Sequence, residues 1–271
     1  MSSSHRTIDV TRLSAEGAIA RADDVAVEEP LEIRVAGDTL AVTMRTPGND
    51  RELALGFLWA EGIIASLDDV ASVAHCGRGD DEGRTNTIEV TPAPGAHLRL
   101  PDDSPARRGT LTSSSCGVCG RRSIDDLLAR CKPVEAAQMD RAALVRALES
   151  LRASQPLFAK TGGCHGAALV TLDGAHVATF EDVGRHNAVD KLVGAMLLAK
   201  KLPLRGHALV VSGRTSFEIV QKAVAAGIPI VAGVSAASSL AVDVAKRSNV
   251  ALVGFAREGR CVVYAGAERI R

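Results

Sequence analysis

The sequence predicts an α/β fold, or α+β when all 271 residues are considered together. In the N-terminal half, short strand-like runs follow one another with turn residues between them. In the C-terminal half, apolar runs of strand length alternate with amphipathic stretches of helix length. Hydrophobic residues make up 46% of the chain, which is enough for a buried core. We therefore expect a smaller β-rich domain followed by an alternating α/β domain.

The N-terminal half opens with a polar stretch and a hairpin. Residues 1–24 are polar and weakly patterned, so we expect a disordered tail there. The runs LEIRV (31–35) and TLAVTMR (39–45) alternate apolar and polar residues around the short AGD turn. This pattern predicts two strands joined as a hairpin.

A helix and two further strands are expected next. In the segment TPGNDRELALGFLWAEGII, Asn49 and Glu52 have the spacing of a capping box at a helix start. VASVAHC (70–76) and TNTIEV (85–90) read as strands. The β-rich domain is thus predicted over residues 25–135.

The end of this domain is expected to be a mobile loop, at about residues 101–122. It contains prolines, serines and arginine pairs, and it ends in the sequence SSSCGVCGRR. Helices are predicted after it at SIDDLLARC (123–131) and DRAALVRALESL (140–151).

The C-terminal part, residues 136–271, alternates strands and helices. Apolar strands interleaved with helices predict a largely parallel sheet that is covered on both faces. At one helix start, Thr215 and Glu218 have capping-box spacing. Strands are expected at 166–172, 176–180, 207–212, 228–233, 250–255 and 261–266, and helices at 187–201, 215–227 and 238–248.

This order of elements is that of a cytidine-deaminase-like α/β/α domain, by analogy of fold. Zinc deaminases carry H-x-E after the hairpin and P-C-x-x-C at the next helix start. Here His186 is followed two residues later by Ala188, and the segment SGRTSFE contains no cysteine. We therefore predict the scaffold without its zinc, and no metal site.

Composition and charge exclude several classes of function. The formal net charge is zero, so a general nucleic-acid surface is not expected. No apolar run reaches the roughly 18 residues of a membrane span, and the N-terminus does not read as a secretory signal. We expect a cytoplasmic protein that binds neither nucleic acid nor membrane. Six cysteines in such a chain do not indicate a disulfide framework.

Four loops are predicted to meet at one edge of the α/β sheet: residues 161–167, 181–187, 212–216 and 254–260. Glycines and helix N-termini there suit a bound anion, and arginines bind phosphate bidentately. The sequence therefore predicts a phosphate-bearing small molecule as the ligand. The polar residues that these loops contribute are Asp182, Arg185, His186, Arg214, Arg257 and Arg260.

Each of these features also has a structural explanation. Ser212 and Gly213 can form an ordinary turn, and Glu218 can act only as a cap. His186 can be a hydrogen-bonded structural histidine, and Asp182 an acid at a helix start.

Cys116 and Cys119 form the one close cysteine pair. A zinc ribbon requires two such pairs, so zinc is not favoured. Flanking arginines and the helix predicted from Ser123 favour the thiolate. Such a thiol suits either a persulfide carrier or thiol–disulfide exchange, and it can also be inert.

Eight segments, in this order along the chain, resemble the FdhD family of formate dehydrogenase accessory proteins. The resemblance covers about residues 28–260 and is far more specific than the cysteine pair alone. The segments are EPLEIRV, MRTPG, ELALGFLWAEGII, SSSCGVCG, TGGCHGA, EDVGRHNAVDKLVG, SGRTSFEIVQKA and SAASSLAV.

The resemblance implies a sulfur carrier of sulfurtransferase type. A cysteine desulfurase would load sulfane sulfur onto Cys116 as a persulfide, with Cys119 assisting. The acceptor would be the molybdenum bis-guanine-dinucleotide cofactor, before its insertion into the catalytic subunit of formate dehydrogenase. GDP or GMP would mimic that cofactor, and the protein would be a homodimer.

The resemblance also implies where the cofactor binds. Its segment FAREGR corresponds to Phe255, Ala256, Arg257, Glu258, Gly259 and Arg260. We add Asp182, His186 and Arg214 to this predicted site from their place in the fold. Two other functions are open at this point: a guanine-nucleotide-binding chaperone whose thiols are incidental, and a dithiol oxidoreductase.

Overall fold

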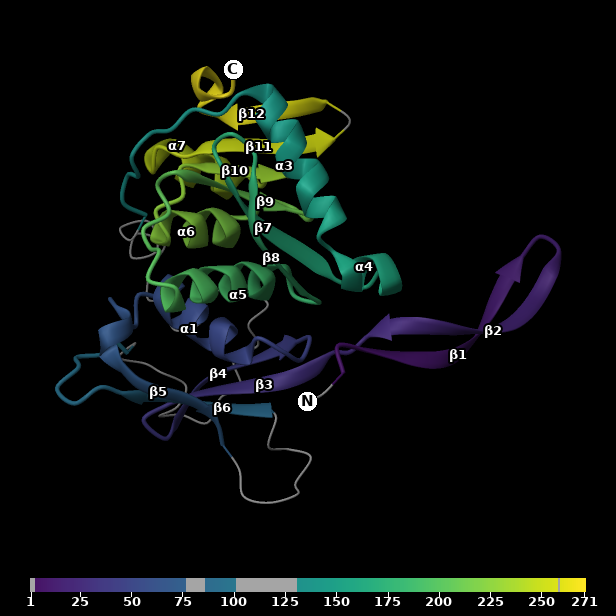
Figure 1. Cartoon of the computed structure of the whole chain (residues 1–271), viewed down its shortest axis with the longest axis horizontal. Helices are drawn as coiled ribbons and strands as arrows, with labels where there is room; N and C mark the ends of the chain where they lie inside the picture. Colours follow the sequence, from purple (N-terminus) through teal and green to yellow (C-terminus); the bar gives the residue numbers. More distant parts are fainter. Residues whose placement is uncertain (1–2, 77–85, 101–130, 258) are drawn as a thin grey trace.

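Three β-sheets organise the part of the chain that the computed structural model describes (Figure 1). The structure describes residues 3–76, 86–100, 131–257 and 259–271. A two-stranded arm extends from a body with two lobes, one built on a four-stranded sheet and the other on a six-stranded sheet. Among the described residues, no helix has both the length and the apolar character needed to cross a bilayer.

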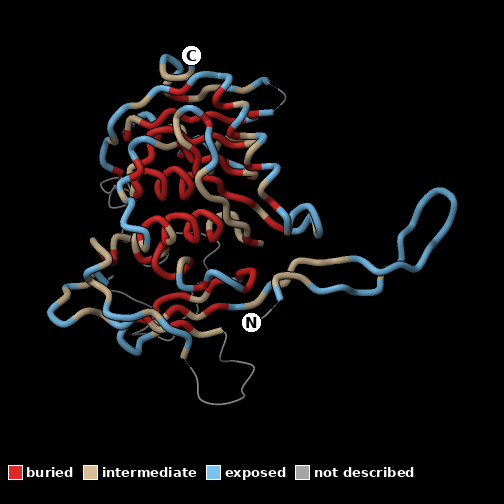
Figure 2. Tube along the Cα trace, in the orientation of Figure 1, coloured by how far each residue is buried: buried red, intermediate tan, exposed pale blue. Residues whose placement is uncertain are grey.

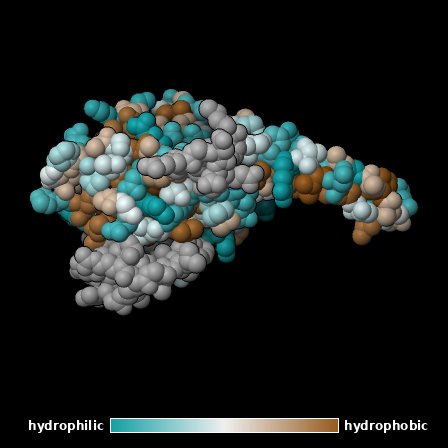
Figure 3. Space-filling view, turned by 90° about the horizontal axis from the view of Figure 1, so that it is seen from below, coloured by the Kyte–Doolittle hydropathy of each residue, from teal (hydrophilic) through white to brown (hydrophobic). Residues whose placement is uncertain are grey.

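The arm replaces the disordered tail expected for residues 1–24, so that prediction is wrong. Strands β1 (His5–Ser14) and β2 (Gly17–Ala26) pair antiparallel along their whole length. Most of their side chains are exposed, and Leu13 and Ile19 are exposed by 77% and 66% (Figures 2 and 3). A ribbon that is open on both faces has no buried side to impose an apolar–polar alternation, which is why the sequence pattern was weak.

The smaller lobe has the strands and helix that the sequence predicts. One face of its sheet packs against helix α1, and the core between them includes Leu31, Ile33, Leu55 and Leu58. The sheet order is β4-β3-β6-β5, with β3 and β6 parallel. Its elements are β3 (Glu29–Val35), β4 (Asp38–Arg45), α1 (Asp50–Ala60), η1 (Leu67–Asp69), β5 (Val70–His75) and β6 (Thr87–Pro92).

The larger lobe is built on a mixed sheet of order β12-β11-β10-β9-β7-β8. Only the pairs β9–β10 and β10–β11 are parallel, so the prediction of a largely parallel sheet is wrong. The hairpins β7–β8 and β11–β12 account for two of the antiparallel pairs, and β7 is also antiparallel to β9. The strands are β7 (His165–Thr171), β8 (His176–Asp182), β9 (His207–Val211), β10 (Ile230–Gly233), β11 (Ala251–Arg257) and β12 (Arg260–Ala265).

Helices cover both faces of this sheet, as predicted. Helices α5, α6 and α7 form a core with one face, and α3 forms a separate core with the other. The short helix α4 lies against β2 at the base of the arm. These helices are α3 (Arg141–Ala153), α4 (Pro156–Thr161), α5 (Arg185–Leu198), α6 (Phe217–Ala225) and α7 (Ser239–Arg247), and η4 (Ala267–Arg269) follows the last strand.

Neither predicted capping box forms. Asn49 precedes α1 with a left-handed backbone (φ 55°), and its side chain makes no capping hydrogen bond. The residue before α6 is Ser216 rather than Thr215, and it also makes no side-chain cap. The carboxylate of Glu218 instead contacts His186 on α5.

Helices α1 and α5 pack with their backbones in contact, and this packing joins the two lobes. A Cβ atom built on Gly56 would lie 1.9 Å from the carbonyl oxygen of Asp190. A Cβ on Gly194 would lie 1.9 Å from the carbonyl oxygen of Glu52. Only glycine therefore permits the crossing, and each helix supplies one.

Replacing Gly194 with Ala should destabilise the protein by about 2 kcal/mol or more, because the two helices must separate. Alanine in an ordinary helix position would instead stabilise by about 1 kcal/mol relative to glycine. The sign of the change in the free energy of unfolding, measured in urea, therefore tests the crossing. Gly206→Ala is the control, since a Cβ there meets nothing within 4 Å. A stabilised Gly194→Ala variant would contradict the packing.

Candidate functional site

The carboxyl ends of strands β9, β10 and β11 carry three loops that are joined by backbone hydrogen bonds. The N–H of Thr215 donates to the carbonyl of Ala236 (3.1 Å), and the N–H of Ser238 donates to the carbonyl of Thr215 (3.2 Å). The N–H of Phe255 donates to the carbonyl of Ser235 (3.0 Å). The segments 212–216 and 254–257 therefore lie at one edge of the sheet.

The same edge receives both ends of the β7–β8 hairpin. Because β7 is antiparallel to β9, its amino end, His165, lies there, and Asp182 at the end of β8 is its register partner. The edge is thus built from one strand start, several strand ends, and the beginnings of α5 and α6.

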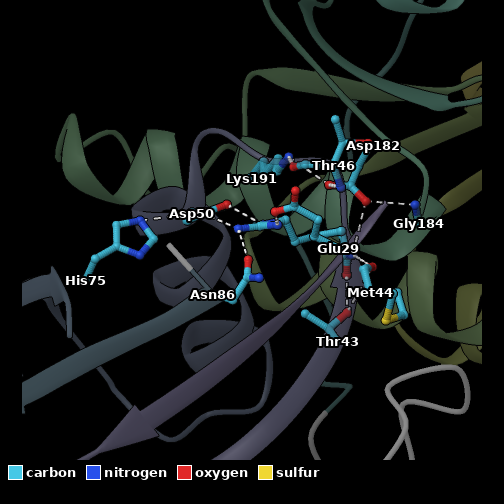
Figure 4. A network of polar contacts seen from close by, with 12 residues as sticks. Glu29, Thr43, Met44, Thr46, Asp50, His75, Asn86, Asp182, Gly184 and Lys191 are labelled. Atoms are coloured by element: carbon cyan, nitrogen blue, oxygen red, sulfur yellow. Dashed lines mark hydrogen bonds and ion pairs between the residues drawn. The ribbon is translucent and has the colours of Figure 1, made fainter. Parts of the chain in front are cut away.

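Asp182 is fully buried and holds this edge together rather than facing a ligand (Figure 4). One carboxylate oxygen accepts hydrogen bonds from the N–H of Gly184 (2.8 Å) and the amide of Asn187 (3.1 Å). The other accepts from the N–H of Thr46 (3.1 Å) and lies 2.7 Å from the ammonium of Lys191. Four donors occupy all the acceptor positions of a carboxylate.

Thr46 links this carboxylate to the smaller lobe. Its hydroxyl accepts a hydrogen bond from the N–H of Val183 (3.1 Å), and its carbonyl accepts one from Lys191 (2.9 Å). The neighbouring Arg45 is completely buried and pairs with Asp50 (3.0 Å) and Glu29 (3.1 Å). The loop before α5 is therefore fixed by residues from the other lobe.

His186 forms an ion-pair contact with Glu218. The Nε2 atom of the imidazole lies 2.5 Å from a carboxylate oxygen of Glu218 and 3.2 Å from the hydroxyl of Ser216. The His186 side chain is 14% exposed, so it is mostly buried but still accessible to solvent. This pair ties the start of α5 to the start of α6, and it is the reason that Glu218 does not cap its own helix.

His165 lies among positive charges. Burial lowers its pKa, and the nearby Arg185 and His186, with Arg214, lower it further, while Asp182 acts in the opposite direction. Gly213 allows a close approach, because a Cβ at that position would lie 3.2 Å from Nδ1 of His165. Arg214 is exposed and stands on the same loop as Gly213.

Phe255, Ala256 and Arg257 form the end of β11, and Arg260 begins β12, where the register between the two strands is irregular. Phe255 has a left-handed backbone (φ 48°) and a side chain that is 44% exposed, whereas Ala256 is buried. Arg257 is exposed and pairs in register with Arg260, across a turn that contains Gly259 at φ 72°. Glu258 lies outside the described residues.

The cysteine pair itself, Cys116 and Cys119, lies outside the described residues. Among the cysteines that are described, Cys164 lies directly before β7 and is buried. Burial, with the carboxylate of Glu181 beside it, raises the pKa of Cys164 to about 12. Its thiol lies 3.4 Å from that carboxylate, so it is held in the protonated form.

The structure thus gathers His186 and Arg214 near one point and gives Asp182 a structural role. The sequence placed the loop 161–167 at this edge but did not single out His165, and it did not reveal Glu218 or Thr46 as parts of the edge. A Cys-His dipeptide just before an apolar strand was the available signal for His165. Within the described ranges, no group of three or more histidine, cysteine or acidic side chains is placed to hold a metal ion.

Comparison with known proteins identifies relatives over almost the whole chain. The model of the FdhD/NarQ family matches residues 26–271. The "Sulfur carrier protein FdhD" of Anaeromyxobacter dehalogenans strain 2CP-1 is 55% identical over 255 residues, covering 92% of this chain and 88% of its own. The protein of the same name from Nocardia farcinica is 48% identical and covers 97% of this chain and 93% of its own.

A solved structure has a similar fold. It is a crystal structure from Desulfotalea psychrophila of a protein assigned as a formate dehydrogenase accessory protein. The two chains are 26% identical and superpose with a TM-score of 0.76, over 98% of this chain and 99% of the other.

Replacing Lys191 with Met should reduce the free energy of unfolding by about 3–5 kcal/mol, because Asp182 is then a buried charge without its cation. The double variant Lys191→Met/Asp182→Asn removes both charges and should regain part of that loss. Unfolding in urea measures both. Single and double variants that are equally stable would show that the two side chains are not coupled.

Cys164 should resist alkylation in the folded protein. With a pKa of about 12, only about one thiol in ten thousand is ionised at pH 8. Iodoacetamide followed by peptide mass spectrometry should modify Cys164 only after unfolding, whereas the partly exposed Cys261 serves as the internal control. Modification of both at equal rates would contradict the protonated, sheltered state.

Proposed function

This chain belongs to the FdhD/NarQ family, and on that premise we propose that it is a sulfur carrier that serves formate dehydrogenase. The observation that carries the proposal is the family match, whose matched residues include Cys116 and Cys119. The protein would act in the cytoplasm as a homodimer. Its partners would be a cysteine desulfurase and the catalytic subunit of formate dehydrogenase.

Loading would take place at Cys116. Its thiolate attacks the outer sulfur of a persulfide on the desulfurase, and the sulfur–sulfur bond of the donor breaks. The donor cysteine leaves as a thiolate, and Cys116 now carries the sulfane sulfur. No net oxidation or reduction occurs in this step.

Delivery would use Cys119. Its thiolate attacks the inner sulfur of the Cys116 persulfide and forms a Cys116–Cys119 disulfide. The outer sulfur takes the two electrons that the two thiols lose and leaves as hydrosulfide at the acceptor. An external dithiol reductant then restores the pair. The acceptor would be the molybdenum bis-guanine-dinucleotide cofactor, as the substrate of the transfer.

The sheet edge supports the binding of such an acceptor. His186 lies at the start of α5, Arg214 on the loop after β9 and Arg257 at the end of β11, all at one edge of the sheet. Phosphate groups favour arginine and helix N-termini. Phe255, near the end of β11, offers an exposed aromatic ring beside them. We propose that residues 255–260 hold the guanine end and that Asp182 only positions the loop before α5.

We also propose that the larger lobe is a cytidine-deaminase-like domain without zinc, spanning residues 136–271, with the β-rich domain at 25–135. The strand order β8-β7-β9-β10-β11 and the helices on both faces support this assignment. The position that would hold a zinc ligand carries His186, which is paired with Glu218.

Intact-mass spectrometry after incubation with a cysteine desulfurase and cysteine tests the carrier function. The wild-type chain should gain the mass of one sulfur atom, which peptide mapping should place at Cys116. Cys116→Ala should lose the gain and should fail to activate formate dehydrogenase. Cys164→Ala is the matched control, because its thiol is buried and protonated.

Three outcomes separate the competing functions. Full activation by Cys116→Ala would favour a nucleotide-binding chaperone with incidental thiols. Turnover of a small dithiol substrate without any sulfur donor would favour an oxidoreductase. No mass gain with an active desulfurase would overturn the carrier function.

A further inference from the structure

Three basic side chains at the sheet edge lack a carboxylate partner within the described ranges: His165, Arg185 and Arg214. They come from the start of β7, the first residue of α5 and the loop after β9. The nearby acids are already engaged, since Glu218 pairs with His186 and Asp182 is saturated by its four donors. The cluster therefore carries positive charge that the described part of the protein does not balance.

Arg185 is incompletely satisfied. Its Nε atom is buried and has no hydrogen-bond partner in the part of the chain that the structure describes. A buried guanidinium nitrogen without an acceptor costs free energy that a bound anion can recover. This observation points to a ligand rather than to a surface charge.

The main chain beside the cluster is open to an anion. A Cβ atom on Gly213 would lie 3.2 Å from Nδ1 of His165 and 4.0 Å from Cβ of Arg185, so this glycine lies against both side chains. Helices α5 and α6 begin at the same place, and neither N-cap, Gly184 or Ser216, makes a side-chain capping bond. Their first N–H groups and dipoles are therefore available to negative charge.

We propose that His165, Arg185 and Arg214 bind one phosphate group of the guanine nucleotide ligand, with the main chain of Gly213 beside it. Two guanidinium groups match the charge of a phosphate dianion, and the imidazole adds a third donor. The proposal rests on the proposed function for the identity of the nucleotide, but the phosphate subsite can be tested without sulfur chemistry.

Protonation of His165 provides a specific signature. In the free protein, burial and the charges of Arg185, His186 and Arg214 keep the pKa of His165 below the ordinary value, although Asp182 acts in the opposite direction. A bound phosphate adds negative charge and raises that pKa. Near neutral pH the complex should take up protons, and binding should weaken as the pH rises through the pKa of the complex.

Isothermal titration calorimetry with GDP, inorganic pyrophosphate and guanosine tests the subsite. Titrations at pH 6.5 in two buffers that differ in heat of ionisation measure proton uptake. Arg185→Gln should weaken GDP and pyrophosphate binding by about ten- to a hundredfold and leave guanosine binding unchanged. His165→Gln should abolish the proton uptake. Thermal unfolding confirms that each variant is folded.

Arg205→Gln is the matched control. Arg205 precedes β9, at the opposite edge of the sheet from Arg214, and pairs with the exposed Glu135. This variant should bind GDP as the wild type does.

The outcomes distinguish this subsite from the carrier function. Loss of GDP binding by folded Arg185→Gln, with normal sulfur loading of Cys116, supports the subsite alone. Unchanged GDP affinity in both variants, equal heats in the two buffers, or no GDP binding by the wild type would overturn it. Phosphate binding by a wild-type protein that never accepts sulfur would retain the subsite and reject the carrier function. Binding of pyrophosphate but not GDP would reject a nucleotide as the ligand.

Discussion

Direct contact between the backbones of α1 and α5 determines how the two lobes are arranged. Gly56 and Gly194 each face a main-chain carbonyl of the other helix, so the axes lie closer than any side chain would allow. That approach brings the loop after β4 against the end of β8. Thr46 then reaches Asp182, and Asp182 fixes the turn from which α5 begins. The position of the site residues on α5 therefore depends on a helix in the other lobe.

Charged side chains form ion pairs on the interior side of that turn, but at the sheet edge part of the positive charge has no such partner among the described residues. In the interior, Lys191 pairs with Asp182 and Lys222 pairs with Asp190. In each ion pair the lysine Nζ lies 2.7 Å from a carboxylate oxygen. Such buried pairs contribute little net stability but fix geometry, because either charge alone would be costly. At the sheet edge, by contrast, the Nε atom of Arg185 has no hydrogen-bond partner among the described residues. The interior neutralises its own charges, whereas the edge carries positive charge that the described residues do not balance.

Much of the fold could be predicted from the sequence because periodicity follows burial. Both lobes bury one side of each element, so their strands and helices are visible as patterns. The arm at residues 5–26 buries neither face, and its pattern is correspondingly weak. The glycine-rich loops that the sequence places at one edge of the sheet do lie together there. The partners of Glu218 and Asp182 could not be predicted, because each depends on a contact between elements that are distant in the sequence.

The chain contains one tryptophan, Trp59, and it lies where the lobes meet. Its indole N–H donates to the carbonyl of Ala225 at the end of α6 (2.9 Å), and its ring packs against both the larger and the smaller core. Its fluorescence is therefore an intrinsic label for this junction. Any separation of the lobes would expose the ring to water and shift its emission to longer wavelength, without a dye or an engineered probe.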